Sequence, residues 1–209
     1  MISNKIFIIG LPRTATTSVC VALLELGFKT AHTAYTKKAM LNAQVIADTP
    51  IFADYQQLDK HYPNARFINL TRDLTHWLPS IQQLLTRMHT NVTRDDGGFN
   101  PIIKRCYQRV FSPFTLDNIN NTQFLTQCYE QHQQGIQAYF SHRPNDLLNL
   151  DVSQPEAYAK LLAFLKITQN MPHSGFSVIN KGGKVTAWNK IKHPNKIEST
   201  NNGKIDLEK

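Results

Sequence analysis

The hydrophobic residues of this 209-residue chain follow two patterns that alternate along the sequence. Short continuous apolar runs are typical of strands covered on both faces, and longer stretches with apolar residues three and four positions apart are typical of helices. The short runs predict strands at residues 5–9, 45–48, 66–71 and 145–152. The longer stretches predict helices at residues 17–26, 37–44, 53–62, 102–111, 122–141 and 155–165, and another at 77–88 after a cap at Asp73 or Thr75.

Strands that alternate with helices predict a parallel sheet between two helical layers. The expected fold class is therefore α/β, with a central parallel sheet in a three-layer α/β/α arrangement. The chain has the length of one domain, which we assign to residues 1–188. Turn-like segments around one short helix make residues 91–121 a lid-like insertion. Residues 189–209 have almost no apolar content, so this basic tail is predicted to be disordered.

Charge and cysteine content restrict the partner and the environment. A net charge of +8 favours an anionic partner, such as a nucleotide or a sulfated or phosphorylated compound. Three widely spaced cysteines, Cys20, Cys106 and Cys128, do not form a disulfide framework and are interpreted as reduced thiols. The apolar run after Lys5 is too short for a signal peptide or a membrane span, so we expect a soluble, cytoplasmic protein.

The first predicted strand ends in a loop that is suited to an anion. Residues 5–19 read KIFIIGLPRTATTSV, so Gly10 follows the strand and Arg, Thr and Ser side chains open the helix. Backbone N–H groups and the positive end of the helix dipole meet at such a loop, which favours phosphate. The ATP- and GTP-binding pattern G-x-x-x-x-G-K-[ST] would place a glycine at Ala15 and a lysine at Thr16. Here the cation lies earlier, at Arg13, although the segment can also serve only to cap the helix.

The strand followed by GLPRTATTS resembles the 5′-phosphosulfate-binding loop of sulfotransferases, whose relatives often read G-x-P-R-[ST]-G-T-[ST]-x-[LV]. The donor in that family is 3′-phosphoadenosine 5′-phosphosulfate (PAPS). The resemblance implies that Arg13 holds the phosphosulfate and stabilises charge on the bridging oxygen. It also implies that the 5′-phosphate accepts hydrogen bonds from Thr14, Ala15, Thr16, Thr17 and Ser18. The departure from the family pattern is Ala15, which replaces a glycine.

A second motif follows the predicted strand at residues 66–71. In FINLTRDLTHWLPSIQQLL, Arg72 stands at the end of the strand and Ser80 lies eight residues later, in the next helix. This spacing resembles the family's 3′-phosphate-binding motif, R-[DN]-P-x-x-x-x-x-S, with Leu74 in place of the proline. The resemblance implies that Arg72 and Ser80 hold the 3′-phosphate, whereas an isolated strand-end arginine can simply pair with an acid such as Asp73. Both motifs should lie at the same edge of the sheet, where ligands of open α/β sheets bind.

The resemblance extends over about residues 5–167, and a separate, weaker match follows near the C-terminus. In VINKGGKVTAWN, Lys181 and Gly182 match the R-K-G loop of cytosolic sulfotransferases, and Asn180 replaces its arginine. The match implies a contact with the adenosine phosphate of the donor. A flexible loop of glycine and lysine is the alternative interpretation.

Sulfuryl transfer requires a base beside the acceptor, and three side chains are candidates. Asp48 is the first choice because it ends the VIAD strand and should face the cleft, although it can equally cap the turn at Thr49. His32 is the second choice, with an ordinary loop histidine as the alternative, and Asp54 can also contribute. Four aromatic residues of the insertion can form a lid over the acceptor or cover the core: Phe99, Tyr107, Phe111 and Phe114.

These features together predict a PAPS-dependent sulfotransferase that acts on a hydroxyl or amine. The expected acceptor is a small molecule, a glycan or a lipid, with PAP as the second product, and no nucleic-acid partner is expected. No metal is expected either, because a sulfuryl group carries less charge than a phosphoryl group and fixed donors can stabilise its transfer. The His and Cys residues also lack metal-ligand spacing. One alternative is a nucleotide kinase or NTPase, which the missing lysine disfavours and for which Asp151 is the only, remote candidate for a magnesium-binding carboxylate. The other is a non-catalytic nucleotide-binding protein.

Overall fold

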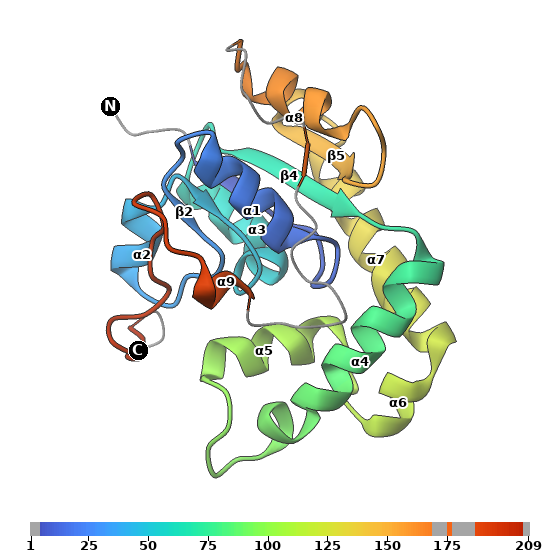
Figure 1. The fold of residues 1–209 in the computed structure, drawn as a ribbon. Helices are drawn as coiled ribbons and strands as arrows, with labels where there is room; N and C mark the ends of the chain where they lie inside the picture. Colours follow the sequence, from blue (N-terminus) through green and yellow to red (C-terminus); the bar gives the residue numbers. More distant parts are fainter. Residues whose placement is uncertain (1–4, 169–174, 177–186, 207–209) are drawn as a thin grey trace.

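The computed structural model describes residues 5–168, 175–176 and 187–206, which contain a five-stranded parallel sheet flanked by helices (Figure 1). The predicted α/β fold class with a central parallel sheet is confirmed. The strands are β1 (Ile6–Ile8), β2 (Thr30–Ala31), β3 (Val45–Ile46), β4 (Arg66–Thr71) and β5 (Leu147–Asp151), in the spatial order β2-β3-β1-β4-β5. The helices are α1 (Thr16–Glu25), α2 (Lys37–Asn42), α3 (Ile51–His61), α4 (Leu74–Thr93), α5 (Pro101–Val110), α6 (Leu116–Asn120), α7 (Thr122–Phe140), the short 3₁₀ helix η1 (Pro144–Asp146), α8 (Ala157–Leu165) and α9 (Ala187–Lys190).

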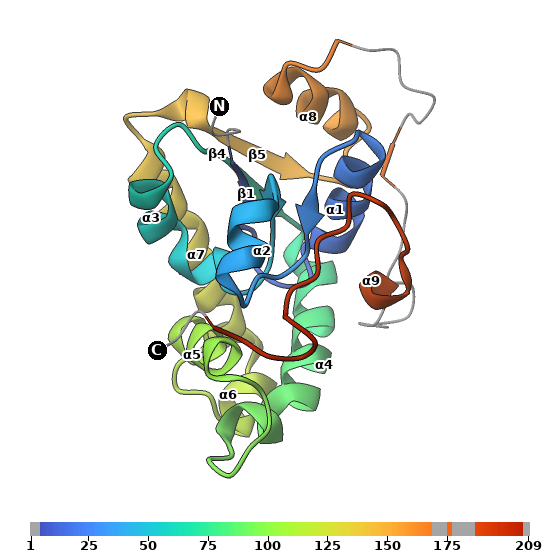
Figure 2. The ribbon, with the colours of Figure 1, turned by 90° about the vertical axis from the view of Figure 1, so that its left-hand side faces the viewer.

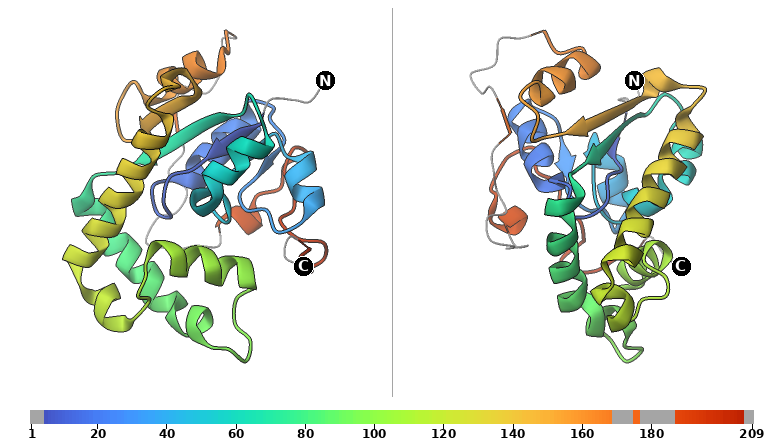
Figure 3. Two further views of the ribbon diagram at one scale, coloured as in Figure 1. Left: turned by 180° about the vertical axis from the view of Figure 1, so that it is seen from behind. Right: turned by 90° about the vertical axis from the view of Figure 1, so that its right-hand side faces the viewer.

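Alternating side chains of β1 divide the core between the two faces of the sheet. Phe7 and Ile9 pack in one cluster with residues of α3 and α7, whereas Ile6 and Ile8 pack in another with residues of α1 and α8. The view from behind shows α3 and α7 on the face opposite α1 (Figure 3). Burial of apolar surface on both faces supplies the main driving force for this arrangement. Among the described residues, no helix combines the length and apolarity needed to cross a bilayer.

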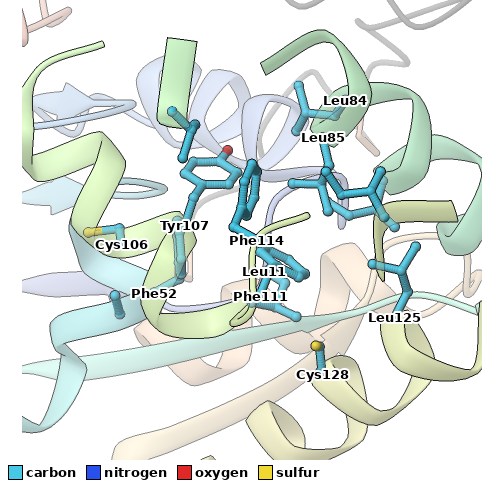
Figure 4. Packing of buried hydrophobic residues seen from close by; sticks show 14 of the residues in the cluster. Leu11, Phe52, Leu84, Leu85, Cys106, Tyr107, Phe111, Phe114, Leu125 and Cys128 are labelled. Carbon is cyan, nitrogen blue, oxygen red and sulfur yellow. The ribbon is translucent and has the colours of Figure 1, made fainter. Parts of the chain in front are cut away.

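A third apolar cluster lies beyond the carboxyl end of β4, where α4, α5 and α6 extend away from the sheet (Figure 1). The loop after β1 reaches into it, because Leu11 is fully buried beside Phe111 and Phe114 (Figure 4). Residues 91–121 were expected to hold one short helix, and the structure shows two helices there, α5 and α6. The aromatic residues Phe111 and Phe114 cover a core and do not form a lid.

The C-terminal segment, residues 187–206, differs from the disorder predicted from residue 189 onward. It runs beside the edge strand β2 (Figure 2). The N–H of Thr30 donates a hydrogen bond to Asn195 O over 2.9 Å, and the carbonyl oxygen of Thr30 accepts a hydrogen bond from the N–H of Ile197 over 2.9 Å. Farther along, Tyr35 N–H donates to Ser199 O over 2.9 Å. Composition did not predict this pairing because an exposed strand edge binds a segment through backbone groups, which polar residues also possess.

His132 of α7 fixes the point at which β1 enters the loop. Its Nε2 lies 2.9 Å from Ile9 O, one residue before Gly10, and therefore carries the hydrogen in this contact. Burial lowers the pKa of His132 to about 4 from its ordinary 6.5, despite the opposing effect of the hydrogen bond to Ile9. The imidazole is therefore neutral at pH 7.

This lowered pKa predicts a loss of stability between pH 6.5 and pH 4. As the pH falls through this interval, the unfolded chain binds a proton at His132 and the folded chain does not, so the free energy of unfolding decreases by up to roughly 3 kcal/mol. His132→Gln keeps an N–H donor at a similar place but cannot titrate. Urea unfolding at pH 7 and pH 4.5 should therefore show a smaller decrease in the variant than in the parent. His142→Gln, at an exposed position, is the control. A decrease in the free energy of unfolding in His132→Gln as large as in the parent would contradict the account.

Candidate active site

The loops that follow β1, β3, β4 and β5 open into one cleft of about 910 Å³. The loop at residues 12–18 forms its floor, and α4 and α5 form the wall on the other side. Because the strands are parallel, their carboxyl ends lie together at this edge of the sheet, as the sequence predicted. The predicted residues that line the cleft are Arg13, Thr14, Ala15, Thr16, Thr17, Ser18, His32, Asp48 and Arg72.

Close packing and left-handed residues shape the loop after β1. A Cβ atom on Gly10 would lie 2.6 Å from Leu70 Cβ of β4, so only glycine lets the chain leave the sheet here. Arg13 and Ala15 both have φ near 74°, and Ala15 adopts this left-handed conformation at the position where the resembling loops have glycine. Helix α1 then begins at Thr16 without a side-chain cap. The first N–H groups of a helix have no partner within it, so they are suited to bind an anion in the cleft.

The two predicted anion-binding motifs contact each other directly. Arg13 Nε donates a hydrogen bond to Ser80 Oγ over 2.7 Å. In the other direction, Arg72 Nη1 donates to the Arg13 carbonyl oxygen over 2.9 Å. Ser80 does not line the cleft, and it is connected to the cleft through its hydrogen bond with Arg13. Arg72, at the end of β4, therefore hydrogen-bonds to the loop after β1 and does not pair with Asp73, which was the alternative interpretation.

Two aromatic residues hold these motifs in place, and sequence reasoning gave them no such role. Trp77 of α4 is fully buried and donates Nε1–H to Pro12 O over 3.0 Å. Tyr129 of α7 accepts the Arg72 N–H at 2.9 Å and donates its hydroxyl to Arg72 O over 3.0 Å. The Tyr129 contacts join residues 57 positions apart, so no local pattern in the sequence could indicate them.

Positive charge gathers around the loop. Burial lowers the pKa of Arg13, and the nearby guanidinium groups of Arg87 and Arg72 lower it further. Arginine nevertheless stays protonated in proteins, so three cationic side chains line one cleft. Mutual repulsion between them is relieved when an anion binds, which makes the cleft a site for a highly charged ligand.

Asp48 and His32 lie on the other side of the loop. His32 Nε2 is 3.3 Å from Thr16 Oγ1 and 3.0 Å from Thr17 Oγ1. Burial lowers the pKa of His32, an effect that the Asp48 carboxylate partly offsets. Burial raises the pKa of Asp48, and His32 and the hydrogen bonds from Thr49 partly offset this rise. The two groups are thus close enough to influence each other, and both face the cleft.

The remaining candidates lie elsewhere. Asp54 does not line the cleft, because it forms a bidentate pair with Arg105 at 2.8 Å and a longer contact with Arg109 at 3.4 Å. Asp151 lines the cleft but accepts hydrogen bonds from the N–H and the hydroxyl of Ser153. Lys181 and Gly182 lie outside the described residues. Within the described part of the chain, no group of three or more His, Cys, Asp or Glu side chains could hold a metal ion.

Comparison with known proteins agrees with the architecture of this cleft. A family model described as a sulfotransferase domain matches residues 5–38 and 32–185, which together make up most of the chain. The match includes both motifs that meet at Arg13. No curated protein matches the chain. From the family match, the chain belongs to the sulfotransferase domain family.

Proposed function

We propose that this protein transfers a sulfuryl group from PAPS to a hydroxyl or amine group of an acceptor. Membership in the family supports sulfotransferase activity in general, and the identity of the donor is our proposal. The observation that carries it is the direct bond between Arg13 and Ser80, with Arg72 on the Arg13 carbonyl. This linkage brings together, at the start of α1, the two motifs that the family resemblance assigns to the 5′- and 3′-phosphates of one nucleotide.

In this proposal the donor lies along the floor of the cleft. Its 5′-phosphosulfate binds the N–H groups of residues 14–18 and the Arg13 guanidinium, with the Thr16, Thr17 and Ser18 hydroxyls nearby. Its 3′-phosphate binds Arg72, and Ser80 contributes through its hydrogen bond to Arg13. The family pattern also assigns Lys181 and Gly182 to the adenosine phosphate. Hydrogen bonds to charged groups are stronger than neutral ones, which gives the bisphosphorylated nucleotide its advantage over nucleotides with one phosphate.

The transfer step is a substitution at the sulfur atom. The acceptor oxygen or nitrogen forms a bond to the sulfur atom while the bond from sulfur to the bridging oxygen breaks. The electron pair stays on that oxygen, which becomes part of the 5′-phosphate of PAP and is stabilised by Arg13. The acceptor proton passes to the Asp48 carboxylate, whose raised pKa makes it a stronger base than an ordinary aspartate. His32 is the second candidate, since its lowered pKa leaves a neutral imidazole at pH 7.

We further propose that residues 1–188 work as one sulfotransferase domain and that part of the 91–121 segment covers the acceptor. Phe99 and Tyr107 support this arrangement because both line the cleft. The C-terminal segment also contributes to the cleft through Trp188, whose ring centroid lies 5.4 Å from that of His32.

The first prediction of the proposed function concerns the 3′-phosphate. Arg72→Ala removes both the proposed phosphate contact and the support of the Arg13 carbonyl, so binding of PAP and of adenosine 5′-phosphate should both weaken. The loss for PAP should exceed the loss for adenosine 5′-phosphate by about 1.5–3 kcal/mol, the range for a hydrogen bond to a charged group. Isothermal titration with the two nucleotides measures this difference.

Arg109→Ala is the matched control for this experiment. Arg109 is on α5, outside the cleft, and its partner Asp54 keeps the closer pair with Arg105. The control should bind both nucleotides as the parent does. Equal losses for PAP and adenosine 5′-phosphate in Arg72→Ala would show that Arg72 acts on the loop alone, and the assignment of the 3′-phosphate would be wrong.

The second prediction concerns the base. Asp48→Asn should keep PAP affinity and lower turnover by roughly 10²–10⁴, the usual effect of removing a positioned general base. Turnover is measured as transfer of radioactive sulfate from labelled PAPS to a panel of hydroxylated small molecules, sugars and lipids. The parental rate should fall as the pH drops through the raised pKa of Asp48, because the carboxylate must be ionised to accept the proton.

Two results would change this assignment. Parental turnover in Asp48→Asn would transfer the role of the base to His32, which His32→Gln would then test. No labelled product from any acceptor, together with no binding of PAP, would reject the sulfotransferase proposal in favour of a non-catalytic protein.

A further inference from the structure

Asp48, the proposed base, ends a chain of hydrogen-bonded side chains that begins in the loop after β2. The Tyr35 hydroxyl is 2.7 Å from Thr49 Oγ1, and Thr49 Oγ1 donates in turn to Asp48 Oδ1 over 3.4 Å. Because the Thr49 hydrogen is directed to the carboxylate, Tyr35 is the donor in the first contact. Both hydroxyls therefore donate toward Asp48, and a carboxylate that accepts a hydrogen bond is favoured in its charged form.

The two hydroxyls of this chain are removed from water. Tyr35 is 7% exposed and Thr49 is 2% exposed, and buried hydroxyls are normally hydrogen-bonded. Burial raises the pKa of Tyr35, so its hydroxyl keeps its hydrogen and can donate. Asp48 keeps some exposure, and all three residues line the cleft. The chain thus runs from the buried wall of the cleft to a carboxylate that a substrate can reach.

Backbone hydrogen bonds hold the two donors in place. Ala34 N–H donates to Thr49 O over 3.1 Å, which ties the loop after β2 to the loop after β3. Tyr35 N–H donates to Ser199 O over 2.9 Å, and Tyr35 O accepts from Asp206 N–H over 3.0 Å. The C-terminal segment therefore binds both backbone groups of Tyr35, and this segment lies beyond the residues that match the family model.

The backbone of Asp48 has a conformation that requires such support. Its φ of 50° is left-handed, a region that side chains other than those of asparagine and aspartate rarely adopt. Residues in this region persist where the surrounding structure holds them, and they cluster at active sites. The strand end at Asp48 is therefore a place where the fold maintains an uncommon geometry around a carboxylate.

The ionisable groups that influence Asp48 electrostatically are His32, Tyr35, Cys20 of α1 and Tyr107 of α5. Burial lowers the pKa of His32 and raises the pKa of the other three groups, so all four are uncharged at pH 7. Burial also raises the pKa of Asp48, and His32 and the hydrogen bonds from Thr49 oppose this rise. A neutral His32 adds no charge at pH 7, so at that pH the bonds from Thr49 favour the ionised carboxylate.

We propose that Thr49 and Tyr35 are positioning residues for the base, because their hydroxyls orient the Asp48 carboxylate and keep it ionised until it accepts the acceptor proton. This inference rests on the proposed function, since it assigns residues that act on the base of that reaction. It also gives the C-terminal segment a role in the active site, because that segment holds the first donor of the chain.

The pKa of Asp48 can be measured directly, without turnover. Carbon-13 at the aspartate carboxyl gives NMR signals that follow ionisation, and the signal missing from Asp48→Asn identifies Asp48. Thr49→Val removes the donor and keeps the branched side chain, so the pKa of Asp48 should rise by about one pH unit. Thr49→Ser keeps the hydroxyl and should restore the parental value. Tyr35→Phe removes only the first donor and should give a smaller rise.

Turnover as a function of pH provides the functional readout. In Thr49→Val the acidic limb of the profile should move to higher pH with the pKa of Asp48. Turnover above this limb should also fall about tenfold, because the carboxylate is no longer oriented. PAP affinity should stay within about twofold of the parent. The control is Thr86→Val, which removes an exposed hydroxyl of α4 outside the cleft and should match the parent in every measurement.

Three results would count against this inference. An equal pKa of Asp48 in Thr49→Val and the parent would overturn it, and a rise that Thr49→Ser does not reverse would indicate packing in place of a hydroxyl donor. No rise in Tyr35→Phe would overturn the part assigned to Tyr35. Failure of the parent to bind PAP would instead reject the proposed function, and the NMR titration would still decide whether the hydroxyls act on Asp48.

Discussion

The site depends on one linkage between two parts of the chain that the sequence separates by almost 60 residues. Arg72, at the end of β4, holds the carbonyl of Arg13, and Arg13 in turn holds Ser80 on α4. Through these two bonds the loop after β1 and the start of α4 form one unit. Gly10 makes the approach possible, because any side chain at that position would collide with Leu70 of β4. The loop after β1, the end of β4 and α4 are therefore held together by contacts within the protein.

The same arrangement concentrates positive charge at a cost that an anionic ligand offsets. Arg13, Arg72 and Arg87 line one cleft, and their repulsion and partial burial are visible in the lowered pKa of Arg13. Buried aromatic residues hold the backbone in place against this repulsion, with Trp77 bonded to Pro12 of the loop and Tyr129 bonded to Arg72. The gathering of cations and the position of the loop thus have a common origin in the packing of α4 and α7 near the end of β1.

Local patterns predicted the parts of this protein that depend on local physics. The run before Gly10, β4 and the spacing from Arg72 to Ser80 follow from hydrophobic pattern and motif, and the fold class is confirmed. Two-residue β2 has too little sequence to show a pattern, and the pairing of residues 195–197 with it uses backbone groups alone. The contacts of His132 with Ile9 and of Tyr129 with Arg72, and the pairing of Asp54 with α5, join distant residues that only the tertiary fold brings together.

The central claim is that the cleft binds a nucleotide with 3′ and 5′ anionic groups through fixed cations and N–H donors, without a metal ion. Calorimetric titration of the parent protein with PAP, and with ATP and GTP, each in the presence of magnesium or of EDTA, tests it most directly. The account predicts that PAP binds equally well in both conditions and at least about tenfold more tightly than ATP or GTP. Binding of ATP or GTP that requires magnesium and exceeds that of PAP would contradict it.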